Sequence, residues 1–131
     1  MKLDSLSRKD IGALGEKVAA EYLRRQGMRL VAKNVARKTG EIDLIVRGKS
    51  TLHFVEVKSI LCDDFPSDGR VRDEYDPAVN LHEAKIRRVA RTSEWYVANI
   101  DWEGEWQVDA MLVWLRRADG RAYVRYLPQI I

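Results

Sequence analysis

Two apolar segments joined by a short polar turn constrain the fold more than any other feature of the chain. The stretch GEIDLIVRGKSTLHFVEVKS, residues 40–59, is typical of two adjacent antiparallel strands around a tight turn. Asp43, Glu56 and Lys58 lie within these strands, although ionised side chains are costly to bury unless they are paired or hold a metal. The hairpin therefore predicts a sheet and also contains the most informative polar residues of the sequence.

The turn determines how the two carboxylates lie relative to each other. Gly48 at the first turn position favours a two-residue type II′ loop, which would make Asp43 and Glu56 diagonal neighbours, roughly 7–8 Å apart at the backbone. A four-residue loop over residues 48–51 would place them directly opposite each other, and a slip of one residue would send them to opposite faces. Two of these arrangements bring the carboxylates together, and Lys58 shares the face of Glu56.

The other face of the hairpin is expected to be apolar and covered by a helix. Its members are predicted from the alternation of side chains to be Ile42, Leu44, Val46, Val55 and Val57.

The remaining periodicities predict the order αβββαββ, an α/β fold with a mixed central sheet flanked by helices. Besides the hairpin, the expected elements are helices over residues 7–27 and 76–99 and strands over residues 28–35, 105–116 and 121–128. Residues 60–76 read as a long polar loop, which inside a compact domain is usually functional or disordered. The strand over residues 105–116 is apolar on both faces, as a central strand should be.

Local signals mark the ends of the helices. Ser7 and Asp10 resemble a capping box, and Gly27 supplies a stop for the first helix. Asp76 and Pro77 suggest the start of the second helix. The buried stripe of the first helix is expected to comprise Ile11, Leu14, Val18 and Tyr22.

Composition limits the class of protein. With 131 residues, of which 46% are apolar and 33% charged, the chain is expected to form one ordinary globular domain, residues 1–131. A net charge of +3 says little about partners by itself. The single cysteine, Cys62, excludes an internal disulfide and is an improbable nucleophile because no base is near it in the sequence. No signal peptide, anchor or membrane partner is expected, so a cytoplasmic location is the default.

Convergent carboxylates beside a lysine suit a hard divalent cation. Mg²⁺ typically takes one or two carboxylates together with waters and phosphate oxygens. Such a site can activate water for hydrolysis of a phosphodiester. Asp43, Glu56 and Lys58 could equally form a cross-strand ionic cluster without chemical function. The spacing leaves both interpretations open.

These residues also carry a family resemblance. GEIDLI (residues 40–45) followed by FVEVK (residues 54–58) resembles the PD-(D/E)xK nuclease superfamily, which has the restriction-endonuclease-like fold. Within it, the chain is similar to the YraN-like family of predicted endonucleases, relatives of the archaeal Holliday-junction resolvases. The likeness begins in the first helix at Gly12, Gly15 and Glu16, and it ends near Asp109.

The resemblance implies a function and a set of site residues. Asp43, Glu56 and the Val57 carbonyl would hold Mg²⁺, with Mn²⁺ as a substitute. Lys58 would be the catalytic lysine, and Glu16 would be a further acidic contributor. The implied activity is a metal-dependent endonuclease acting on DNA, including branched or flapped structures. A non-catalytic nucleic-acid-binding or partner-docking module with the same fold is the alternative.

Basic residues suggest where DNA would lie. Lys85, Arg88 and Arg91 on the second helix, with Arg37 just after the first expected strand, are expected to contact phosphates. A homodimer would fit cutting of both strands. The segment over residues 61–75 is longer and more acidic than is usual in the family, and its charge beside a DNA site would repel phosphate.

Two other polar residues are expected to have structural roles. His53 lacks a second histidine at metal spacing, so we expect it to be packed or exposed. Asp109 lies in an apolar strand, where it is expected to satisfy a buried arginine or a backbone group.

Overall fold

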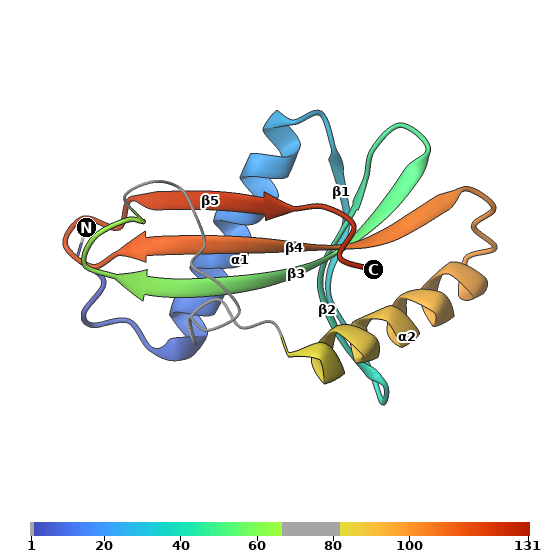
Figure 1. The fold of residues 1–131 in the computed structure, drawn as a ribbon, viewed down its shortest axis with the longest axis horizontal. Coiled ribbons are helices and arrows are strands. Elements are labelled where there is room, and N and C mark those ends of the chain that lie inside the picture. The colour runs from blue at the N-terminus through green and yellow to red at the C-terminus, as the bar shows by residue number, and fades with distance from the viewer. Residues whose placement is uncertain (1, 67–81) are drawn as a thin grey trace.

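The five strands of the described residues form one mixed sheet (Figure 1). The computed structural model describes residues 2–66 and 82–131. In chain order the elements are α1 (Arg8–Arg25), β1 (Arg29–Arg37), β2 (Gly40–Arg47), β3 (Thr51–Cys62), α2 (Glu83–Asn99), β4 (Glu105–Arg116) and β5 (Ala122–Leu127). Strand order in the sheet is β1-β2-β3-β4-β5, with β3 and β4 parallel and the other neighbours antiparallel. The predicted α/β class and the order αβββαββ are confirmed.

The two helices cover opposite faces of the sheet. Val55 packs in the cluster that contains Ala19 of α1, whereas its neighbour Phe54 packs in the cluster that contains Val89 of α2. Because successive residues of a strand point to opposite faces, α1 and α2 must lie on opposite sides of β3. Figure 1 shows α1 crossing behind β3, β4 and β5, while α2 runs beside β2.

Helix α1 begins and ends as its local signals predict, but it buries a different stripe. The side chains of Ser7 and Asp10 form the expected capping box, and Gly27, with a φ of +89°, follows the end of the helix. The buried residues are Ile11, Gly15, Ala19 and Leu23. The predicted stripe was therefore wrong at Leu14, Val18 and Tyr22, which are only partly buried at its margin. The small side chains at the centre let α1 lie closer to the sheet.

The turn between β2 and β3 is the four-residue loop, which is one of the two predicted loops that would bring Asp43 and Glu56 together. Arg47 pairs with Leu52, and the N–H of Gly48 donates to the carbonyl of Thr51 at 3.0 Å. The favoured type II′ loop is wrong because it needs a positive φ at Gly48, and the described glycines with positive φ are Gly27, Gly40 and Gly120. The pairing ends at Leu44 and Val55, and Asp43 and Glu56 are the next residues of the two strands.

The side chains of β2 stop alternating regularly between the two faces of the sheet at Asp43. Leu44 and Val46 pack in the cluster beneath α1, as predicted, but Ile42 packs with Ile45 in the cluster beneath α2. The prediction that Ile42 shares the face of Leu44 was therefore wrong. The interruption lies opposite Asn34 of β1, which has a φ of +54° between the pairs Lys33–Leu44 and Val35–Ile42. The change of face in β2 therefore coincides with a left-handed residue on the neighbouring strand.

The segment between β3 and α2 differs from its prediction at both ends. Strand β3 extends to Cys62, so residues 60–62, which were predicted to belong to the loop, are part of the strand. Helix α2 begins at Glu83, since His82 has a ψ of 125°, and the predicted cap at Asp76 and Pro77 lies outside the described residues. Strands β4 and β5 match their predictions to within one residue. In the parts of the chain that are described, no helix is long and apolar enough to cross a bilayer.

Candidate metal and phosphate site

The candidate site lies where β2 and β3 separate. Their pairing runs from Arg47–Leu52 to Leu44–Val55 and goes no further in the described chain. Beyond it, Oδ2 of Asp43 accepts the backbone N–H of Val57 at 2.8 Å, so a carboxylate takes the place of the next backbone acceptor. The N–H and carbonyl of a strand residue lie on the same edge, and the Val57 carbonyl therefore faces the same opening.

A close contact between α1 and β3 forms one wall of this opening. A Cβ added to Gly15 would lie 1.7 Å from Oγ of Ser59, so the helix backbone rests directly on the strand. The resulting cleft has a volume of about 660 Å³. The functional candidates that line it are Glu16, Asp43, Glu56, Val57, Lys58 and Lys85. The fold therefore gathers residues of α1, β2, β3 and α2 around one cleft.

The two central carboxylates are in an unfavourable environment when both are ionised. Burial, followed by the negative charge of Glu56, raises the pKa of Asp43 to about 7. The N–H of Val57 and the charge of Lys85 oppose this shift but do not cancel it. Carboxylates that are crowded and desolvated in this way are typical of metal and catalytic sites.

Glu56 is almost fully buried and only half satisfied. Its side chain is 4% exposed, and Oε1 lies 2.5 Å from Nζ of Lys85. Oε2 is buried and, when both carboxylates are ionised, has no hydrogen-bond partner among the described residues, whereas a protonated Asp43 can donate a hydrogen bond to Glu56. An unsatisfied carboxylate oxygen at the centre of a cleft is costly unless a ligand supplies a positive charge or a donor.

The donor set suits a hard cation. The Glu56 Oε2 atom, the Asp43 carboxylate and the Val57 carbonyl are all oxygens, which Mg²⁺ prefers. No group of three or more His, Cys, Asp or Glu side chains in the described residues is arranged to hold a metal. Waters and substrate oxygens would have to complete the shell, as is usual for Mg²⁺. Lys58, two residues beyond Glu56 on β3, also lines the cleft.

Glu16 is affected by the charges of the neighbouring carboxylates. Burial raises its pKa first, and the charges of Asp43 and Glu41 add to the effect. A side-chain hydrogen bond with Asn34 lowers the pKa in part. Asn34 therefore contacts the candidate residue Glu16 from β1, a role that was not predicted from the sequence. Its signal was present, because asparagine is enriched at positive φ, yet that preference does not indicate which strand position uses it.

The predicted phosphate-binding residues are spread over a wider area. Lys85 lines the cleft, and it also lines an adjoining hollow of about 240 Å³ together with Arg88. The guanidinium of Arg37 lies 3.9 Å above the ring centre of Trp95, in a separate hollow at the turn between β1 and β2. Arg91 is exposed on α2. Of these four predicted residues, Lys85 and Arg88 border the carboxylates.

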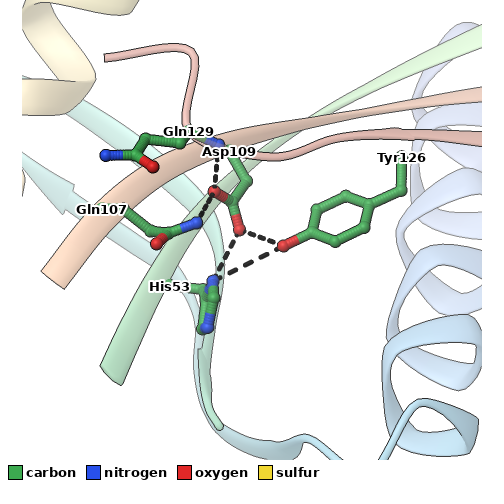
Figure 2. A network of polar contacts seen from close by, with 5 residues as sticks. All are labelled: His53, Gln107, Asp109, Tyr126 and Gln129. Atoms are coloured by element: carbon green, nitrogen blue, oxygen red, sulfur yellow. Dashed lines mark hydrogen bonds and ion pairs between the residues drawn. The ribbon is translucent and has the colours of Figure 1, made fainter. Parts of the chain in front are cut away.

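A second polar cluster is buried between β3, β4 and β5 (Figure 2). Asp109 is 0% exposed and accepts hydrogen bonds from Tyr126, from the Gln107 side chain and from the backbone N–H of Gln129, while Nδ1 of His53 lies 2.7 Å from its Oδ2. Burial alone would raise the pKa of Asp109, but its partners hold it below the usual value. Of the two partners predicted for Asp109, the structure shows the backbone group, and His53 is packed as expected.

Comparison with known proteins identifies the family. Residues 15–113 match the uncharacterised protein family UPF0102, and the chain belongs to this family. The match includes Glu16, Asp43, Glu56, Lys58 and Lys85.

Several relatives match across most of their length. A UPF0102 protein of Syntrophotalea carbinolica is 32% identical over 126 residues, which cover 92% of this chain and 90% of the relative. A UPF0102 protein of Campylobacter fetus is 33% identical over 102 residues, 78% of this chain and 81% of the relative. One from Symbiobacterium thermophilum is 39% identical over 90 residues, 69% of each chain. The expected YraN-like membership is confirmed at this level, whereas the nuclease relationship stays a prediction.

Proposed function

We propose that this member of the UPF0102 family is a divalent-metal-dependent endonuclease that hydrolyses phosphodiester bonds in DNA. The observation that carries the proposal is the buried, unpartnered Oε2 of Glu56 in the same cleft as the Asp43 carboxylate. A site built for structure alone would satisfy both oxygens of a carboxylate that is 4% exposed.

The functional candidates that line the cleft have separate roles in this proposal. Asp43, Glu56 and the Val57 carbonyl would hold Mg²⁺ or Mn²⁺, which when bound activates water and neutralises charge on phosphate. The Lys58 ammonium would orient the attacking water or offset the negative charge that develops on the phosphate oxygens. Glu16, whose pKa is raised by burial and by the neighbouring carboxylates, would add a further acidic group that can exchange a proton with water in the cleft.

The charge around the cleft supports DNA as the substrate. Lys85 and Arg88 border the carboxylates from α2, and Arg91 and Arg37 extend the positive charge away from them. Ammonium and guanidinium groups bind phosphates without reading base sequence. Recognition by backbone and shape suits branched or flapped DNA.

Cleavage assays test the proposal. Branched, flapped, single-stranded and unbranched duplex DNA should be incubated with Mn²⁺ or Mg²⁺ and the wild-type protein, and the products separated by electrophoresis. Asp43→Asn and Lys58→Met should each lower the rate by about 10²–10⁴-fold, because they remove a ligand or a charge needed in the transition state. Lys17→Met, which removes an exposed lysine of α1, is the matched control and should cleave at the wild-type rate.

One observation favours the alternative, a non-catalytic module that binds nucleic acid or a partner. Lys85 already supplies Glu56 with a counter-charge, so the acidic cluster is partly compensated without a metal. DNA binding with no cleavage of any substrate in either metal would support this alternative and refute the nuclease.

A further inference from the structure

Lys85 is the cation that neutralises Glu56 in this structure, and it reaches the site from a different layer of the fold. Glu56 lies in the centre of the sheet on β3, whereas Lys85 lies in the first turn of α2. The Lys85 side chain is 56% exposed although its Nζ is 2.5 Å from a nearly buried oxygen. The ammonium therefore enters the cleft from the solvent side.

We propose that Lys85 is an exchangeable counter-cation: it pairs with Glu56 in the metal-free protein, is displaced when a divalent cation binds, and then contacts a substrate phosphate. This inference rests on the proposed function, and it adds a link between metal binding and DNA binding that the carboxylate site alone does not contain.

The charge balance of the cleft explains the displacement. A buried carboxylate requires a counter-charge, and Lys85 supplies one. A divalent cation on the free Oε2 of Glu56 would bring two positive charges next to the ammonium and would satisfy the carboxylate better. The long stem of lysine lets the ammonium move into solvent without a change in the helix.

The position of Lys85 indicates where the released ammonium would go. Lys85 lines both the carboxylate cleft and the adjoining hollow that contains Arg88. A phosphate held by Arg88 would therefore lie within the space that the lysine side chain already borders. The same residue would neutralise Glu56 before a metal binds and would help to hold the substrate after the metal has bound.

Calorimetric titration with Mn²⁺ alone tests the exchange without any measurement of activity. Lys85→Met should bind Mn²⁺ about three- to tenfold more tightly than the wild type, because the competing ion pair is gone. Lys85→Arg, which keeps the charge, should restore an affinity within about twofold of the wild type. Arg87→Met removes an exposed cation two residues away and should also leave the affinity within about twofold.

The outcomes separate this inference from the proposed function. Equal or weaker Mn²⁺ binding by Lys85→Met, with clear binding by the wild type, would overturn the exchange and leave the metal site standing. No Mn²⁺ binding by any of the proteins would overturn both. Because Lys85 is half exposed, its variants are expected to fold, and circular dichroism would check this.

DNA binding with Ca²⁺ in place of the catalytic metal tests the second half of the exchange. Each phosphate contact adds about 0.9 to the slope of log affinity against log salt concentration. Addition of Ca²⁺ should steepen this slope by about one contact more in the wild type than in Lys85→Met. An equal change in both proteins would refute the transfer of Lys85 to phosphate, and absence of DNA binding in both would refute it together with the nuclease.

Discussion

Replacement of Asp43 by asparagine should make the metal-free protein more stable, although it removes a proposed ligand. Burial and the charge of Glu56 raise the pKa of Asp43 from its ordinary value of 3.8 to about 7. The unfolded chain keeps the lower value, so ionisation of Asp43 weakens the fold progressively as the pH rises from about 4 to 7. A shift of about three units corresponds to at most ~4 kcal/mol. Solvent screening of the partly exposed side chain reduces this to about 2 kcal/mol.

Urea denaturation in the presence of EDTA measures the effect. Asparagine has nearly the same shape and keeps an oxygen that can accept the N–H of Val57. We expect Asp43→Asn to raise the free energy of unfolding by about 2 kcal/mol at pH 8 and by less than about 1 kcal/mol at pH 5, where the wild-type carboxyl is protonated. Asp4→Asn, at an exposed aspartate, is the control and should change neither value. A variant that is no more stable than the wild type at pH 8 would refute the reasoning.

Three further predictions test other parts of the structure. Calorimetry between pH 5.5 and pH 8 should show Mn²⁺ affinity falling about tenfold per pH unit below about 7, because the buried carboxyl must first lose its proton. In thermal denaturation, Gly15→Ala should cost ~1–3 kcal/mol because its Cβ would lie 1.7 Å from Oγ of Ser59. Gly12→Ala, with no atom within 4 Å of the new Cβ, should be neutral or stabilising. Tyr126→Phe should cost ~1–2 kcal/mol in urea denaturation at pH 7, since Asp109 loses a donor. That cost should shrink below about pH 4. The lowered pKa of Asp109 stabilises the fold fully above the pKa of the unfolded chain, and this stabilisation is lost as the pH falls through the lower pKa of the folded protein.

The elements of the fold could be predicted because their signals are local. Ser7 and Asp10 lie three residues apart, so the capping box is visible in the sequence and is present in the structure. The apolar run over residues 105–116 is the central strand β4. Helix α2 begins at Glu83 after a non-helical His82, and the caps predicted at residues 76 and 77 lie outside the described residues.

The candidate site could be predicted only in part. Alternation in the hairpin brought Asp43 and Glu56 together in two of the loops considered, and the structure adopts one of them. The alternation of residue types did not reveal that Ile42 faces α2. This change of face lies opposite a left-handed residue on the neighbouring strand, Asn34, which the pattern of β2 alone does not indicate. The sequence also predicted that Lys85 contacts DNA, but it did not indicate that Lys85 forms an ion pair with Glu56.

Residue types and their spacing alone determined the order of helices and strands and the presence of two acidic residues in adjacent strands. These properties depend on interactions within a few residues along the chain, so periodicity is enough to predict them. Tertiary structure alone decided that Gly15 rests on Ser59, that Lys85 neutralises Glu56 and that one carboxylate oxygen is left without a partner. These features depend on segments that are distant in the sequence, and the packing of both helices on the sheet determines how closely those segments approach each other.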